Sequence, residues 1–464
     1  MKLAIFWFRR DLRLADNPGL LAALDAAQRV LPVYLWSPED EGEWAPGGAS
    51  RWWLQQSLGN LDAALRARGS RLLLRAGPAV ETLAALVAET GAEAVCWNRL
   101  YDPALVARDT KVKAQLHDLG VDARSFKASL LLEPWELETG KGDPYRVFTP
   151  FWKAALRRPE PGAPVAAPRD LKPPSQWPAG LELGALGLMP AIRWHDGLAA
   201  RWQPGEDGAH ARLADWCDGG LGEYASGRNR PDRDGTSALS PYLHHGELSP
   251  RQAWHAATAR RGALPEAELE CWLRELGWRE FAHHVLYHFP HTPTEPMYEK
   301  YAAFPWRENH DELLEAWQRG RTGIPIVDAG MRQLWATGWM HNRVRMIVAS
   351  LLVKNIRAPW QAGARWFWDT LVDADLANNT LGWQWSAGSG ADAAPYFRIF
   401  NPVTQGEKFD PAGAYVKRWV AELRDLSPGQ VHRPWEAPPC GYAAPVVDLK
   451  QSRAEALAAL KSLR

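Results

Sequence analysis

Residues 1–131 alternate short apolar runs with longer segments in which apolar residues recur at helical spacing. Apolar runs over 3–8, 30–36, 71–74 and 94–97, with a weaker run over 123–127, predict strands. The segments over 17–29, 52–68, 79–90 and 104–119 predict helices, and Asp16-Asn17-Pro18 is a helix-start signal. Strands that alternate with helices form a parallel sheet covered on both faces. We therefore expect a doubly wound α/β domain over 1–131.

The pattern changes twice after this domain. Residues 132–205 are rich in proline, which breaks regular structure, and they predict a surface connector. From 206 to 464 the periodicity is helical, with no convincing strands, and Ser249-Pro250-Arg251-Gln252 has the composition of a capping box. The second domain is predicted to be all-α.

Composition narrows the class of protein. The 54 basic and 54 acidic residues cancel, which excludes a wholly basic nucleic-acid coat. The N-terminal apolar run is too short for a signal peptide, and no run is long enough to span a membrane. The four cysteines form no CxxC pair, which argues against a disulfide framework or thiolate metal site. We expect a cytoplasmic monomer. The 26 tryptophans could serve packing, base stacking or electron transfer.

Three hydroxyls and a glycine precede a predicted helix over 234–243 (DGTSALSPYL). Backbone N–H groups at a helix start, together with hydroxyl side chains, suit a diphosphate. An N-capped helix explains the same residues, and the spacing alone favours that interpretation.

Two further segments place unusual side chains on one helical face. Trp272, Glu275, Trp278 and Arg279 lie three or four residues apart, which suits either a cavity for a planar ligand or an amphipathic helix with a polar rim. Trp339, Asn342, Arg345 and Met346 repeat the pattern. Asp373 and Asp375 follow downstream, but no histidine or third acid stands at ligand spacing, so no metal site is predicted.

These motifs carry a resemblance to a known family. The segments FWFRRDLRLADNP, VFTPFWKA, DGTSALSPYL, WLRELGWREF, GWMHNRVRM, DTLVDADLANNTLGWQW and DAAPYFRIFNPVTQGEKFD occur in order along nearly the whole chain. The chain resembles the photolyase/cryptochrome family and, within it, the bacterial class I-like cyclobutane pyrimidine dimer DNA photolyases. The resemblance implies an α/β antenna domain and a helical domain that holds FAD. In the family, light excites the fully reduced anionic flavin, which lends an electron to a flipped-out thymine dimer so that the cyclobutane ring splits.

The resemblance assigns a flavin site. It implies cofactor contacts from Tyr224, Thr236, Ser237, Ala238, Leu239, Ser240, Trp272, Arg345, Asp373, Ala374, Asp375 and Asn379. Arg345 is expected to pair with Asp373, and Asn379 to face flavin N5. A neutral amide there can accept the N5–H of reduced flavin, whereas a carboxylate would repel an anionic ring.

The resemblance also assigns a site for UV-damaged DNA. Trp278 and Trp385 match the aromatic walls of the lesion pocket, Met346 a non-polar contact, Glu275 the acid that binds the base edge, and Asn342 a residue between flavin and lesion. Positions that match phosphate contacts are Arg228, Arg279, Arg343, Arg398 and Lys408.

Electron transfer and light harvesting are expected on the same basis. Trp306, Trp360 and Trp383 match a chain of tryptophans that leads from flavin to surface. An antenna chromophore is also implied, with methenyltetrahydrofolate, a deazaflavin or a second flavin as the alternatives, but Ala104-Leu105 stands where the best-known folate binders carry Asn-Glu.

A photoreceptor of the cryptochrome type, which binds FAD without repairing DNA, is the alternative function. Asn379, Trp385, Met346 and the absence of a long polar tail after Ala437-Pro438 favour repair. Asn342 and Met346 also stand where (6-4) photolyases would carry a histidine-rich segment.

Overall fold

The computed structural model describes residues 1–393, 397–436 and 441–463, so Ala437-Pro438 and Cys440 lie outside the described residues. Its N-terminal part is a parallel five-stranded sheet in the order β3-β2-β1-β4-β5. The strands are β1 (Leu3–Phe8), β2 (Arg29–Trp36), β3 (Leu73–Ala76), β4 (Ala94–Asn98) and β5 (Asp122–Phe126). All five predicted strands are confirmed, with ends displaced by up to two residues.

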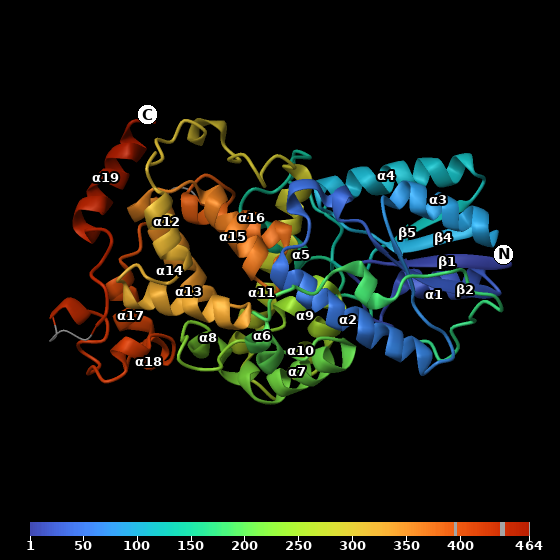
Figure 1. Ribbon diagram of the computed structural model, residues 1–464, viewed down its shortest axis with the longest axis horizontal. Coiled ribbons are helices and arrows are strands. Elements are labelled where there is room, and N and C mark those ends of the chain that lie inside the picture. The colour runs from blue at the N-terminus through green and yellow to red at the C-terminus, as the bar shows by residue number, and fades with distance from the viewer. Residues whose placement is uncertain (394–396, 437–440, 464) are drawn as a thin grey trace.

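Helices cover both faces of this sheet, as the alternating pattern predicts (Figure 1). They are α1 (Pro18–Ala26), α2 (Gly48–Arg66), α3 (Ala79–Thr90) and α4 (Pro103–Asp118). Successive side chains of β1 point to opposite faces: Phe6 and Phe8 pack with α1 and α2, whereas Ile5 and Trp7 pack with α3 and α4. The doubly wound α/β architecture is therefore confirmed.

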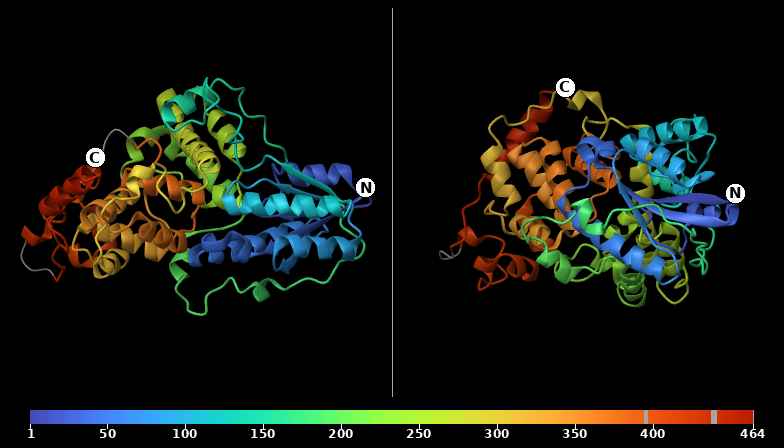
Figure 2. Two further views of the ribbon diagram at one scale, coloured as in Figure 1. Left: turned by 90° about the horizontal axis from the view of Figure 1, so that it is seen from above. Right: turned by 45° about the vertical axis from the view of Figure 1, so that its right-hand side comes forward.

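The proline-rich connector contains more regular structure than its sequence predicts. It forms α5 (Phe148–Ala155), the 3₁₀ turn η2 (Leu183–Leu186) and α6 (Asp196–Arg201). Helix α5 forms because Phe148 and Phe151 find a hydrophobic partner in Phe281 of the helical domain, which a local pattern cannot reveal. The rest of the connector passes outside α2 (Figure 2), where Leu186 and Leu188 join the sheet's hydrophobic core.

Helices make up the remainder of the described chain, and no strand follows β5 there. They are α7 (Glu206–Asp218), η3 (Gly220–Glu223), α8 (Tyr224–Gly227), α9 (Ser240–His245), α10 (Pro250–Thr258), α11 (Glu266–His288), η4 (Glu299–Tyr301), α12 (Asp311–Gln318), α13 (Pro325–Thr337), α14 (Asn342–Ser350), the π-helical η5 (Leu351–Ile356), α15 (Trp360–Thr370), α16 (Leu376–Ala387), α17 (Pro402–Phe409), α18 (Ala414–Trp419), η6 (Ala421–Leu423), η7 (Pro434–Glu436) and α19 (Leu449–Lys461). The predicted capping box at Ser249 is present. Domain boundaries at 131/132 and 205/206 stay a prediction.

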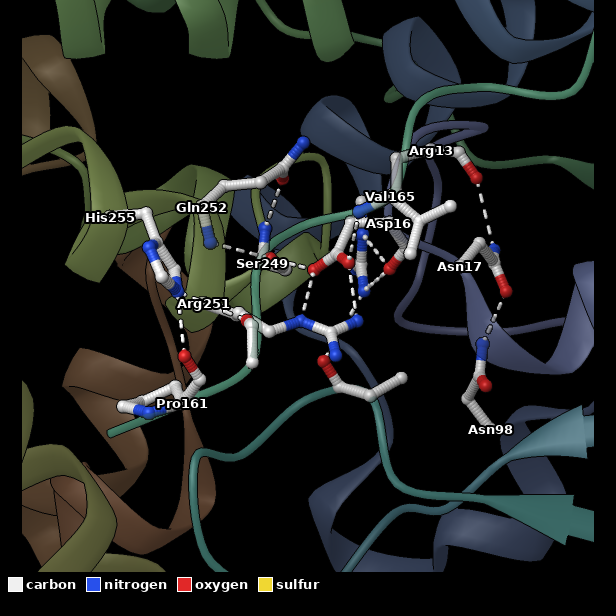
Figure 3. A network of polar contacts seen from close by, with 12 residues as sticks. Arg13, Asp16, Asn17, Asn98, Pro161, Val165, Ser249, Arg251, Gln252 and His255 are labelled. Atoms are coloured by element: carbon white, nitrogen blue, oxygen red, sulfur yellow. Dashed lines mark hydrogen bonds and ion pairs between the residues drawn. The ribbon is translucent and has the colours of Figure 1, made fainter. Parts of the chain in front are cut away.

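A buried polar network joins the α/β part to the helical part (Figure 3). The Asp16 carboxylate accepts hydrogen bonds from Ser249 Oγ at 2.5 Å, Arg251 Nε at 3.0 Å and the Val165 N–H at 3.0 Å. Arg13, which is wholly buried, donates to the Gly246 carbonyl at 2.8 Å. Arg13 and Asp16, both in the motif FWFRRDLRLADNP, therefore join the α/β part to the helical part. Within the described ranges, no helix is both long and apolar enough to cross a bilayer.

Candidate functional site

A cavity of about 590 Å³ opens among the helices α9, α11, α14 and α16. Its volume lies within the range of roughly 300–1,000 Å³ that is usual for ligand and cofactor sites. Every residue that the resemblance assigns to the cofactor lines it, namely Tyr224, Thr236, Ser237, Ala238, Leu239, Ser240, Trp272, Arg345, Asp373, Ala374, Asp375 and Asn379. The sequence segments that carry them are far apart and meet only in the fold.

The predicted face of α11 points into this cavity. Trp272, Glu275, Trp278 and Arg279 all line it, while Leu269, Leu273 and Phe281 are buried in hydrophobic cores. On α14, Asn342, Arg345 and Met346 line the same cavity, and Trp339 joins them from the preceding turn. Both helical faces therefore line one cavity, and the planar ligand expected there stays a prediction.

The segment that precedes α9 is not the N-capped helix that its spacing favours. No side chain caps α9, whose N-cap position is Leu239. The hydroxyl of Ser240 instead donates to Asp373 Oδ2 at 2.6 Å, and Ala238 has a positive φ of 51°. A non-glycine residue in this region is uncommon, and such strain concentrates at functional sites.

Arg212 of α7 holds this segment from the other side. Its Nε donates to the Ser237 carbonyl at 2.7 Å and its Nη2 to the Thr236 carbonyl at 2.9 Å. The Ser240 hydroxyl is bound to Asp373, so the hydroxyls left for the cavity are those of Thr236 and Ser237, which suit a ligand with acceptor oxygens such as a diphosphate.

Arg345 and Asp373 form the predicted ion pair. Arg345 Nη2 lies 3.0 and 2.8 Å from the two carboxylate oxygens, and its Nε donates to the Met340 carbonyl at 2.8 Å. The side chain of Asp373 is only 3% exposed. The pair therefore places a fixed, neutralised charge on the cavity wall.

Asp375 caps α16 and stays ionised. Its Oδ1 accepts hydrogen bonds from the N–H and the Nδ2 of Asn378 at 2.8 and 2.7 Å, while Oδ2 lies 3.4 Å from His283 and 3.7 Å from His244. Burial raises the pKa of Asp375, but His283 and His244 outweigh burial and hold that pKa well below its ordinary value.

The Asn379 amide has a fixed orientation. Its Nδ2 donates to the Ala364 carbonyl of α15 at 3.1 Å. Since one end of the amide is held by α15 and Asn379 lines the cavity, its oxygen is placed as an acceptor for a ligand N–H.

Aromatic and charged side chains form the mouth of the cavity. Trp278 stacks on Phe148 of α5, with ring centroids 3.8 Å apart. Trp385 lines the same cavity, and the Arg398 guanidinium lies 5.2 Å from the centre of its ring. Met346 lines the same cavity and adds an apolar surface. Two half-buried indoles thus offer flat surfaces to a ligand.

Glu275 pairs with Arg228 at 2.5 Å inside the same cavity. Burial raises the pKa of Glu275 above its ordinary value, although Arg228 opposes this effect. Such a carboxyl group can exchange its arginine partner for a hydrogen bond to a ligand.

The predicted phosphate-binding residues differ in their surroundings. Arg228, Arg343 and Arg398 line the cavity, but Lys408 does not; it is exposed on α17, with Nζ 5.2 Å from the ring of Phe409. The Arg343 guanidinium lies 4.5 Å from the same ring. Lys408 therefore belongs to the surface beside the mouth rather than to the cavity.

Arg279 is the least available of these cations. Its side chain is 11% exposed, and Nη1 donates to the Ser129 carbonyl of the α/β part at 2.7 Å. The structure thus gives Arg279 a role in joining the two parts, which spacing on α11 could not reveal.

Two of the three tryptophans assigned to electron transfer are buried, and the third is half-buried. Trp383 lines the large cavity and, like Trp360, is 2% exposed, whereas Trp306 is half-buried. Trp360 and Trp306 line a second cavity of about 230 Å³. Gly363 permits the close approach of α15 to Trp383, because a Cβ at that position would lie 2.1 Å from the indole.

A third hollow at the carboxyl ends of β1 and β2 bears on the expected antenna. It measures about 50 Å³, and Leu105 lines it together with His244 and Ala374, which also line the large cavity. This volume is too small for a folate or deazaflavin as the side chains stand.

Sequence reasoning missed three residues of the site. Phe148 occurs in a quoted motif, but its role behind Trp278 depends on the fold; Arg212 and His283 gave no signal. No group of three or more His, Cys, Asp or Glu residues is placed to hold a metal ion in the part of the chain that the structure describes.

Comparisons with known proteins agree with this geometry. Residues 4–170 match the family model described as DNA photolyase, and residues 272–462 match that described as the FAD binding domain of DNA photolyase. The chain is 46% identical to the deoxyribodipyrimidine photo-lyase of Agrobacterium fabrum, over 99% of this chain and 98% of that protein. It is 38% identical to Cryptochrome-1 of Arabidopsis thaliana, over 99% of this chain and 70% of that protein. The crystal structure of a bacterial class III photolyase from Agrobacterium tumefaciens superposes with a TM-score of 0.96 at 46% identity, covering 100% of this chain and 98% of that one.

Proposed function

Because the chain belongs to the photolyase/cryptochrome family and carries its FAD-binding domain, we propose that it repairs cyclobutane pyrimidine dimers in DNA by light-driven electron transfer. The observation that carries this proposal is one cavity lined by both residue sets. The residues assigned to the flavin and those assigned to the lesion, Lys408 apart, meet around the same 590 Å³. An electron donor and a damaged base bound there would lie within short reach of each other.

The residues present fit FAD. The Thr236 and Ser237 hydroxyl groups suit its diphosphate, the Arg345–Asp373 pair offers both donors and acceptors, and the Asn379 oxygen can accept a ring N–H. When bound in its reduced form, FAD supplies the photoexcited electron that splits the dimer. The protein's part is to bind this group, to favour the reduced anion with a neutral amide at 379, and to exclude water.

Lesion recognition rests on the cavity mouth. Trp278 and Trp385 offer flat faces to an extruded dimer, and base–aromatic stacking is worth roughly 1–3 kcal/mol per base, comparable to the cost of flipping. Glu275 would exchange Arg228 for the base edge, which frees that arginine for a phosphate. Arg343, Arg398 and Lys408 would contact the flanking backbone.

Trp383, Trp360 and Trp306 are proposed as the route by which an oxidised flavin is reduced from outside. Trp383 lines the large cavity, while the buried Trp360 and the half-buried Trp306 line the second cavity, and this placement supports the assignment. The finer class is also a proposal: the motifs resemble class I-like enzymes, whereas one similar structure is that of a class III photolyase. The proposal names no antenna chromophore, because the hollow at the sheet edge is small.

A repair assay tests the proposal. Purified protein with reduced FAD is mixed with an oligonucleotide that contains one thymine dimer, and the intact thymines are quantified after blue light and in the dark. We expect light-dependent repair of the dimer and none of a (6-4) photoproduct. FAD binding with an unrepaired dimer would overturn the repair proposal and leave the photoreceptor alternative, and repair confined to the (6-4) lesion would overturn the proposed substrate.

A further inference from the structure

Two adjacent buried histidines of α11, His283 and His284, have opposite hydrogen-bonding surroundings. His284 Nδ1 lies 2.9 Å from the Pro134 carbonyl, and its Nε2 accepts the Tyr145 N–H at 3.0 Å. A ring that meets one acceptor and one donor is satisfied as a neutral tautomer. Burial, reinforced by His288, lowers the pKa of His284 to about 4, in agreement with this geometry.

His283 meets an acceptor at each ring nitrogen. Its Nδ1 lies 3.0 Å from the Arg279 carbonyl, and its Nε2 lies 3.4 Å from Asp375 Oδ2. A neutral imidazole has a single N–H and would direct a lone pair at one of these oxygens. Only the imidazolium form can donate to both.

Asp375 is arranged as the partner of this cation. Its Oδ1 is occupied by Asn378 at the N-terminus of α16, where the helix dipole favours a negative charge. Its Oδ2 faces His283, and His244 lies further away at 3.7 Å. Asp375 lines the large cavity, whereas His283 does not. The cation therefore stands directly behind the cavity wall.

We propose that His283 is a positioning residue, held as an imidazolium, which keeps Asp375 ionised and makes the pair neutral toward the flavin cavity. The inference rests on the proposed function only in placing FAD there. Without His283, a lone carboxylate would disfavour the extra negative charge of a reduced flavin.

The other charged groups around His283 leave this assignment intact. Glu280 of α11 is occupied by the backbone N–H groups of Leu131 and Leu132, and Arg279 faces Ser129. From the α/β part, the Tyr101 ring packs edge-on against His283, and the Arg10 guanidinium attracts the Asp375 carboxylate electrostatically. Burial lowers the pKa of His283, but Asp375 outweighs burial and raises it above its ordinary value.

Nitrogen NMR of the full-length protein with labelled histidine tests the charge without any substitution. At about pH 8, well above the ordinary histidine pKa of about 6.5, we expect both nitrogens of His283 to be protonated and His284 to show one protonated and one bare nitrogen. A neutral His283 at that pH would overturn the proposal. The measurement needs neither light nor DNA, and a failure of repair would leave its outcome unchanged.

A matched pair of variants tests the effect on the flavin. In His283→Gln, we expect the midpoint potential of bound FAD to fall, because Asp375 is left as an unpaired carboxylate. At low pH, Asp375 of this variant takes up a proton and loses its charge. The fall in potential relative to the parent protein should therefore grow with pH. In His284→Gln, which replaces a neutral ring, the potential and its pH dependence should equal those of the parent protein. Equal curves for His283→Gln and the parent would overturn the proposal, whereas loss of FAD binding by the parent itself would instead overturn the proposed function.

Discussion

The Trp278 indole lies flat on the Phe148 ring, with centroids 3.8 Å apart and planes 8° from parallel. Phe148 is buried and comes from α5 of the connector, so a segment outside the two main domains supports one wall of the cavity. Because Phe148 covers one face of the indole and Trp278 lines the cavity, the other face is available to a ligand.

Replacing Trp278 with Ala should therefore weaken binding of dimer-containing DNA more than binding of undamaged DNA. The lost stacking of roughly 1–3 kcal/mol corresponds to about a 5- to 150-fold rise in Kd for the lesion. Titration of both oligonucleotides measures the effect. Phe148→Leu, which removes the flat support but retains an apolar side chain, should give a smaller loss in the same direction. A uniform loss for both DNAs would make Trp278 a packing residue.

Changing Trp383 to Phe should slow photoreduction of oxidised FAD while leaving repair by pre-reduced enzyme nearly intact. The indole lines the cavity and precedes Trp360 and Trp306 on the proposed route. Transient absorption of the flavin measures the rate. Trp317→Phe is the matched control, since Trp317 is equally buried and its ring lies 6.1 Å from Trp383. Equal photoreduction in both variants and the parent would remove Trp383 from the route.

Local sequence patterns predicted the elements well and the side-chain partners less completely. The strand over 3–8 and the capping box at Ser249 depend on neighbouring residues, and both are as expected. Helix α5 depends on Phe281, which is more than a hundred residues away in sequence, and was missed for that reason. The resemblance placed Asp375 at the cavity. The proposed charge of His283 instead follows from the distances of its two ring nitrogens to the Arg279 carbonyl and to Asp375, which sequence spacing cannot predict.

Acid should destabilise the protein in part through His341. This residue caps α14 with Nδ1, which accepts the Arg343 N–H at 3.1 Å. Burial, together with Arg343 and Arg345, lowers the pKa of His341 to about 4. Since the unfolded value is near 6.5, the unfolded state binds more protons between these values, and stability falls as pH falls through this window.

The expected loss from His341 is about 2 kcal/mol between pH 8 and pH 5. In His341→Asn, which retains a capping acceptor but does not titrate, the free energy of unfolding should depend less on pH by that amount. Urea denaturation at the two pH values measures both proteins. The same pH dependence in parent and variant would show that His341 is protonated in the folded state as readily as in the unfolded state.

Lys408 should contribute to DNA affinity through charge alone. It is exposed on α17 beside Arg343 and lies outside the cavity, so its contact would be with a backbone phosphate rather than with the lesion. Lys408→Ala should weaken damaged and undamaged DNA equally and reduce the slope of log K against log salt by about one. Lys111→Ala, on α4 at the opposite end of the molecule (Figure 1), removes the same charge and should leave the slope unchanged. Equal slopes in the two variants would move the DNA path away from α17.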